Sequence, residues 1–202
     1  AGVGGSVWTI DLGDIFAEEQ RDILVALSLP EAAAPQRAEA LGQLRAQAFS
    51  VLARRSEVAG PVELNVGRSS DAAAAGAPLH PAVQRHWNRH VATEAFEAAR
   101  AMGQRRDLAG ARRRLEEASR ELSDSALAGE GDRLTQQLLS DLRECLGDLQ
   151  QPDTYDARGS KKMAYMQHMH GRQRACGGGR AETEYGTSAT ITMKALAKAS
   201  IS

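Results

Sequence analysis

Aromatic side chains are scarce in this sequence of 202 residues, since Phe, Trp and Tyr together make up only 4% of it. The hydrophobic total of 42% therefore rests on Leu, Val and Ala, and a core built from these residues is thin for the length. The length itself allows one or two domains. The Arg112–Arg114 run also has no aromatic neighbours on which bases could stack, so we expect an exposed helix face and no nucleic-acid partner.

Cysteine is rarer still, since Cys145 and Cys176 are the only two in the sequence. Their spacing suggests no disulfide framework, so we expect a reducing compartment and a cytoplasmic protein. No apolar run approaches the roughly 20 residues of a membrane span. The N-terminus also lacks the pattern of a secretory leader. The chain begins with Ala instead of Met, and we expect a fragment or a processed product.

The small net charge of −1 conceals an uneven distribution. Residues 157–202 contain eight Lys/Arg and two Asp/Glu, so the residues before them are acidic overall. A basic tail of this kind could touch acidic partners, membranes or RNA, but it is more often simply solvated. After Pro152 the apolar periodicity is lost, and residues 171–190 are rich in Gly, Arg and Thr. We therefore predict a largely disordered tail over 151–202.

The usual chemical motifs are absent too, including a nucleophile elbow and a Gly-rich phosphate-binding loop. His168, His170 and Cys176 are metal-ligand types, but a structural zinc site wants four ligands, so we interpret them as part of a solvated tail. Four carboxylates are clustered near the N-terminus, at Asp14, Glu18, Glu19 and Asp22. Their spacing is not that of a calcium-binding loop, so we expect a solvated acidic loop. We predict a non-enzymatic protein with no catalytic, cofactor-binding or metal-binding residues.

The N-terminal third alternates apolar and polar residues with the period of a half-buried strand. The predicted strands are 7–12, 23–29, 44–52 and 62–66, and helical spacing is an alternative for 44–52. A change of parity near Ala48 and Phe49 predicts a bulge. The predicted connections are the acidic loop 13–20, a stretch at 31–40 that could hold a helical turn, and a charged loop at 54–60. Such an antiparallel sheet has one apolar face, which another layer must cover.

Three later stretches have the apolar spacing of core-facing helices. Pro81 suits the first turn of the first helix and Gly103 its end, while Asp107 and Asp132 are good N-caps for the next two. The predicted stripes are Val83, Trp87, Val91, Ala95, Ala98 and Met102; Leu108, Ala111, Leu115, Ala118 and Leu122; and Leu134, Leu138, Cys145 and Leu149, with Leu142 nearby. The first two helices have the small-residue rhythm of a tetratricopeptide unit, but a solenoid needs several repeats. A plain three-helix packing unit is favoured.

The predicted class is therefore α+β, with an antiparallel β-sheet (a partial β-sandwich) followed by a three-helix antiparallel bundle and a disordered tail. The expected domains are a β-sheet domain at 1–67 that we expect to be incomplete, a linker at 68–80, a helical hairpin plus third helix at 81–150, and the basic tail at 151–202.

Several strings resemble one family when they are taken in order. Residues 10–25 (IDLGDIFAEEQRDILV) are similar to the segment after the von Willebrand factor A domain in plant proteins, several of which carry a RING zinc finger and act as ubiquitin ligases. The other similar strings are 94–101, 106–111, 131–134, Tyr155, 164–166, 173–175 and 185–187. The resemblance spans nearly the whole chain and is poorest over 31–90.

Two departures limit what the resemblance implies. The metal-adhesion string Asp-x-Ser-x-Ser of the A domain does not occur, and neither do the paired cysteines of a RING. The chain thus resembles only the region after the A domain. The resemblance implies a cytosolic, plant-type protein-interaction module that packs against a von Willebrand factor A domain in cis or binds another protein. The alternative is a substrate-binding or scaffolding part of a RING-type ubiquitin ligase whose RING and A domains are not in this chain.

Overall fold

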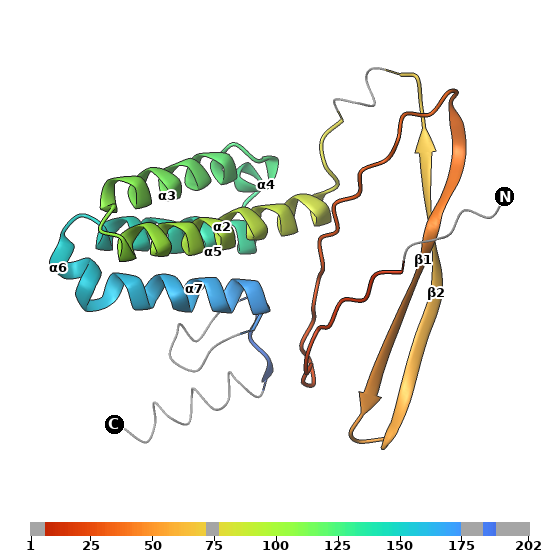
Figure 1. The fold of residues 1–202 in the computed structure, drawn as a ribbon, viewed down its shortest axis with the longest axis horizontal. Coiled ribbons are helices and arrows are strands. Elements are labelled where there is room, and N and C mark those ends of the chain that lie inside the picture. The colour runs from red at the N-terminus through yellow and green to blue at the C-terminus, as the bar shows by residue number, and fades with distance from the viewer. Residues whose placement is uncertain (1–6, 72–76, 175–183, 189–202) are drawn as a thin grey trace. The chain divides into compact units, whose positions relative to one another are not determined.

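The computed structural model describes residues 7–71, 77–174 and 184–188. It has a mixed α+β architecture in which a two-stranded antiparallel sheet precedes the helices, which confirms the predicted class (Figure 1). The chain forms two compact units. The hairpin unit comprises Ala1–Asp11 and Ala26–Pro78, and the helical unit comprises Leu12–Val25 and Leu79–Ser202. Among the described residues, no helix combines the length and the apolar character that a membrane span requires.

The hairpin unit is built on two long strands, β1 (Gln36–Ser50) and β2 (Arg55–Arg68), which pair antiparallel. The register sets Leu44 opposite Val62 and Ser50 opposite Arg55, with irregularities in the pairing before Ala46. Gly60 has a φ of 96°, and a Cβ there would lie 2.7 Å from the Leu44 carbonyl oxygen, so this irregular part of the ladder requires glycine.

The predicted four-stranded sheet is wrong, because only two strands form in the part of the chain that the structure describes. The stretches 7–12 and 23–29 are not in strands, and 12–25 belongs to the helical unit instead of a 1–67 domain. The second half of the predicted connection at 31–40 lies in β1, and the predicted loop at 54–60 lies in β2 except for Arg54. The alternation of apolar and polar residues carries no information about which segments pair with each other.

The details of the third predicted strand also need correction. Residues 44–50 are in β1, so the helical alternative for 44–52 is wrong, and residues 51–54 form the turn. The pairing is regular from Ala46 to Ser50, which rules out the bulge predicted near Ala48 and Phe49. The boundary between the two units follows Pro78, inside the predicted linker 68–80, of which residues 72–76 lie outside the described residues.

The first two helices of the helical unit, α2 (Pro81–Gln104) and α3 (Leu108–Ser123), begin where the sequence predicts. Pro81 occupies the first turn of α2, and the Asp107 carboxylate accepts a hydrogen bond of 2.8 Å from the Gly110 N–H at the start of α3. The buried face of α3 is the predicted one, apart from Leu108, which is partly exposed.

The buried face of α2 is rotated from the predicted stripe. Val83 and Trp87 are exposed by 41% and 38%, whereas Phe96 is fully buried. The residues of α2 that face the core include Val91, Ala92, Ala95, Phe96, Ala99 and Gly103. Trp87 is held at the surface because its indole N–H donates a hydrogen bond of 3.1 Å to Glu121 of α3.

The next helices are the short α4 (Ala126–Gly129) and the long α5 (Arg133–Asp148). Asp132 caps α5 as predicted, because its carboxylate accepts a hydrogen bond of 2.9 Å from the Thr135 N–H. The predicted apolar stripe of α5 is buried, including Cys145, which is a free thiol in the core. Leu115 and Leu138 are both fully buried, on α3 and α5, which contact each other.

The predicted disordered tail is wrong over its first part. Residues after Pro152 form α6 (Pro152–Thr154), the π-helical turn η1 (Tyr155–Gly159) and α7 (Ser160–Arg172), which contacts α2 (Figure 1). The three-helix bundle is therefore not confirmed. Met163, Met166 and Met169 supply the buried face of α7. The rest of the predicted tail is described only at residues 184–188.

Two of the basic residues in this region bind a buried carboxylate. Asp148 of α5 is 2% exposed and lies 2.9 Å from Arg158 Nε and 2.6 Å from Lys162 Nζ. A buried carboxylate needs such partners, because desolvation of an unpaired charge is costly. These two basic residues therefore link η1 and α7 to α5.

Candidate functional site

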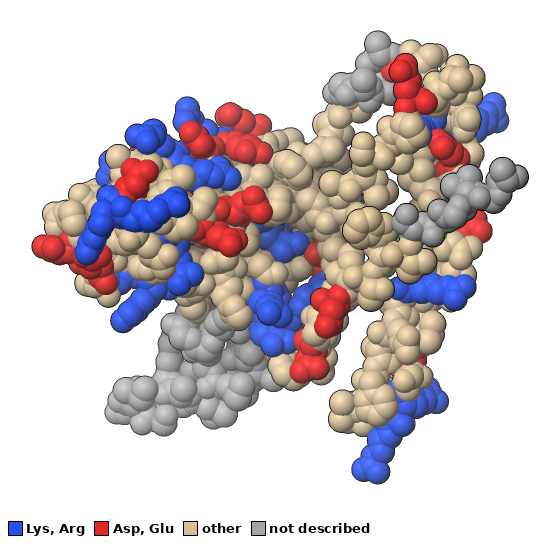
Figure 2. All heavy atoms as spheres, in the orientation of Figure 1, with Lys and Arg blue, Asp and Glu red and all other residues tan. Residues whose placement is uncertain are grey.

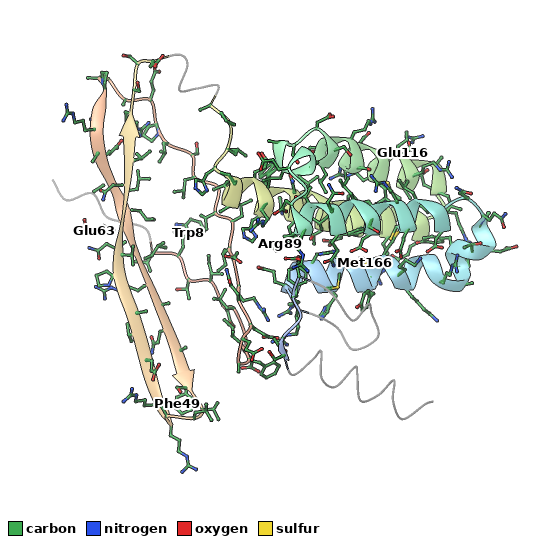
Figure 3. The ribbon with its side chains drawn as sticks, turned by 180° about the vertical axis from the view of Figure 1, so that it is seen from behind. Trp8, Phe49, Glu63, Arg89, Glu116 and Met166 are labelled. Atoms are coloured by element: carbon green, nitrogen blue, oxygen red, sulfur yellow. The ribbon has the colours of Figure 1, made fainter. Side chains whose placement is uncertain are left out.

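The hairpin unit has no core of its own. None of its described residues is buried, and the side chains of Leu44 and Val62, which face each other across the strands, are exposed by 54% and 60%. Phe49 and Val58 are exposed by 64% and 66%, and Figure 3 shows Phe49 at the turn end of the hairpin. Two strands are marginal alone in water, so this surface is a candidate site for another protein layer.

A second candidate lies within the helical unit, where the segment Leu12–Val25 docks on the helices through polar contacts. Arg174, just after α7, makes a bidentate ion pair with Glu19, with Nε–Oε1 and Nη2–Oε2 distances of 2.7 and 2.8 Å. Its Nη2 also donates to the Asp14 carbonyl at 2.9 Å, and its guanidinium lies 4.6 Å from the centre of the Phe16 ring. One arginine therefore binds a carboxylate, a carbonyl and an aromatic face of this segment.

The segment is shaped for this arginine by a tight turn. The Glu19 N–H donates to the Phe16 carbonyl at 3.1 Å, and the Phe16 N–H donates to the Glu19 carboxylate at 3.0 Å. Glu18 has a φ of 66°, a left-handed conformation at the third position of the turn that a type II turn requires. The turn places the Phe16 ring and the Glu19 carboxylate where Arg174 can contact both.

Gln173 holds the backbone of the same segment. Its side-chain amide donates to the Asp22 carbonyl at 2.8 Å and accepts from the Asp22 N–H at 3.0 Å. Gln173 has a φ of 48° at the end of α7, where glycine is the usual residue and a side chain costs roughly 1–2 kcal/mol. The use of glutamine at this strained position is explained by its paired contact with Asp22.

Arg89 of α2 completes the set, and we call Arg89, Gln173 and Arg174 the clamp. Arg89 is 8% exposed, and its guanidinium donates to the Asp22 carbonyl at 2.9 Å and to the His170 carbonyl at 3.1 Å (Figure 3). Burial lowers the pKa of Arg89 from its ordinary value, an effect that nearby negative charge opposes. Arg89 therefore connects α2, the end of α7 and the docked segment.

The surroundings of the clamp change the pKa values of Glu19 and His86. Desolvation would raise the pKa of Glu19, but hydrogen bonds from Arg174 and Phe16 and the charges of Arg174 and Arg21 bring it below its ordinary value. His86 lies 3.5 Å from the Asp22 carboxylate, and burial lowers its pKa despite that neighbour. The carboxylate of Glu19 is thus held ionised at the clamp.

Behind the clamp lies a buried polar cluster. His170 of α7 is fully buried, and its two ring nitrogens lie 3.0 Å from Asp141 Oδ2 and 3.1 Å from the Tyr185 hydroxyl. Its ring stacks on Phe96 at a centroid distance of 6.1 Å. Burial raises the pKa of Tyr185 well above its usual range, so the phenol stays protonated. The cluster fixes the end of α7 whose carbonyl Arg89 binds.

The structure revises the sequence interpretation of the acidic loop and of the histidines. The loop is not simply solvated, because Glu19 and Asp22 are bound by the clamp and Glu18 accepts a hydrogen bond of 2.6 Å from the Ser188 N–H. His168 is exposed whereas His170 is buried, and Cys176 lies outside the described residues. Within the described ranges, no three His, Cys, Asp or Glu residues are grouped to hold a metal ion.

The clamp residues themselves were not predicted as a site. Gln173 and Arg174 occur in one of the family-like strings, but neither has a type or spacing that indicates binding. The Arg112–Arg114 run lies on α3, with Arg113 exposed, and the face drawn in Figure 2 mixes both charge signs over the helical unit. Comparison of the chain with protein-family models, with curated proteins and with solved structures found no match.

Proposed function

We propose that this chain is a non-enzymatic protein-interaction module whose hairpin unit packs against the β-structure of another protein domain. The observation that carries the proposal is the hairpin unit without a core, because strands of 15 and 14 residues expose apolar side chains and two open edges. A partner layer would remove that apolar surface from water, and a partner strand would pair with an edge. Both contributions favour binding of a protein over a small molecule.

The partner that we propose is a von Willebrand factor A domain, in cis or in another chain. Support comes from the family-like strings, which resemble the region that follows such a domain. The expected contact surface is the face of the ladder that has Phe49 and Val58 toward the turn, whereas Leu44 and Val62 pair on the opposite face. Apolar side chains in this arrangement would form the buried centre of an interface.

The test is calorimetric titration of the full chain with a purified von Willebrand factor A domain of a plant RING-type protein. We expect binding with a negative heat-capacity change, the sign of apolar burial. Phe49→Ser and Val58→Ser should each weaken it, whereas Arg113→Ser, an exposed position on α3, should not. Absence of binding, or equal binding by all variants, would refute the proposed partner and surface.

A further inference from the structure

We propose that the clamp is a receptor site for an acidic peptide of another protein, one that has an aromatic residue three positions before a glutamate and forms the same turn between them. The chain's own segment Leu12–Val25 is its exchangeable occupant. This inference is independent of the hairpin and of its proposed partner. The partner peptide is defined by the contacts that the clamp makes with Phe16, Glu19 and Asp22.

The first argument is the balance between backbone and side-chain recognition. Gln173 pairs with the N–H and carbonyl of Asp22, while Arg89 and Arg174 donate to the carbonyls of Asp22 and Asp14. These contacts use backbone groups, so any chain with the same backbone conformation can make them. Side-chain recognition is concentrated at Phe16 and Glu19 and depends on Arg174. The clamp thus specifies a short motif that other proteins can carry.

The second argument is that the segment lies on the surface of the helical unit and is not part of its core. Phe16 and Ile15 are exposed by 62% and 47%, and no residue of Leu12–Val25 is buried. The segment can therefore leave without opening a cavity among the helices. Charge favours acidic occupants, because the segment has four carboxylates and one arginine while two of the three clamp residues are arginines.

The third argument is the backbone conformation of Gln173, which has a φ of 48° at the end of α7. The strain at Gln173 supports a binding role, since glycine would end the helix at lower cost.

The experiment uses the full chain and fluorescein-labelled 14-residue peptides that correspond to residues 12–25, with fluorescence anisotropy as the readout. Glu19→Lys in the chain replaces the bound carboxylate with a charge that Arg174 repels, which frees the clamp. We expect this variant to bind the wild-type peptide about tenfold more tightly than the wild-type chain does, because more of the clamp is vacant. Glu116→Lys, the same charge change at an exposed position on α3, should behave as wild type (Figure 3).

A charge exchange between the chain and the peptide distinguishes direct binding at the clamp from an unrelated structural effect of a variant. Arg174→Glu in the chain should bind a peptide carrying Glu19→Arg and reject the wild-type peptide, the reverse of the Glu19→Lys chain. A peptide with Phe16→Ala should bind the Glu19→Lys chain more weakly than the wild-type peptide. Failure of the exchange, or binding that ignores Arg174, would overturn the proposal. Concentration-dependent dimers of the wild-type chain that Arg174→Glu abolishes would also overturn it, because the occupant would then be a second copy.

Discussion

Gly103 is the position where the close packing of α2 can be tested most directly. A Cβ on this residue would collide with the Tyr155 hydroxyl and Cζ and would lie 2.8 Å from Cε2. Tyr155 is 2% exposed, and its hydroxyl donates to the Arg100 carbonyl at 3.2 Å, so the ring has little freedom to withdraw. Gly103→Ala should therefore destabilise the helical unit, although alanine is the better helix former.

The magnitude follows from opposing effects. Overpacking of a buried site costs about 1–3 kcal/mol, and displacement of Tyr155 would weaken a hydrogen bond with a net value of about 1 kcal/mol. Replacement of a helical glycine by alanine gains about 1 kcal/mol. We expect Gly103→Ala to lower the free energy of unfolding by about 1–3 kcal/mol, measured by urea denaturation followed by helical circular dichroism.

The control is Gly147→Ala on α5, where a new Cβ meets no atom within 4 Å. It should be neutral or stabilising by up to about 1 kcal/mol. In a Tyr155→Leu background the cost of Gly103→Ala should shrink or reverse, because its collision partner has been shortened. If Gly103→Ala were as stable as wild type, or if Tyr155→Leu left its cost unchanged, the steric argument would be refuted.

Three further predictions concern the core, the thiol and the clamp. Leu115→Ala should lower the free energy of unfolding by about 2–5 kcal/mol in urea denaturation, since Leu115 is fully buried, and an unchanged midpoint would contradict this. Burial raises the pKa of Cys145 to about 12, so in a Cys176→Ser chain the thiol should resist a thiol-specific reagent at pH 8 until denaturant is added. Because the pKa of Glu19 is lowered on folding, its stabilising effect is present above the ordinary value of 4.5 and is lost as the pH falls through the folded value. The difference in thermal midpoint between wild type and Glu19→Gln should therefore vanish in acid, and a difference that persisted there would implicate something other than charge.

The helices were predictable because local signals agree with one another. Asp107 and Asp132 act as N-caps where the sequence predicts them, and the leucines of α3 and α5 occupy one buried face each. The stripe of α2 was placed less well, because Trp87 is apolar enough to suggest the core but reaches Glu121 at the surface. Periodicity therefore predicted the buried sides of α3 and α5 and misplaced part of that of α2.

Helix α7 was missed because its buried face is made of methionines among basic and polar residues. Met163, Met166 and Met169 recur every three residues, a helical spacing, but the surrounding charges suggested a solvated tail. Two of those charges, on Arg158 and Lys162, are bound to Asp148 of α5. That pairing joins distant parts of the chain and leaves no signal in local composition.

The clamp was beyond prediction for the same reason. Gln173 contacts Asp22 across 151 residues of sequence, and Arg174 contacts Glu19 across 155. The acidic loop was identified from its composition, but nothing near it indicates a partner. The extended stretches that flank it had the alternation of strands and no strand partner in the part of the chain that the structure describes.

The docked segment can bind the helical unit only late in the synthesis of the chain. Leu12–Val25 leaves the ribosome more than a hundred residues before Gln173 and Arg174 do. Contacts across such a separation require a costly loop closure, so they should form late in folding. A chain that stopped short of Gln173 would lose its C-terminal residues and also the attachment of its N-terminal segment.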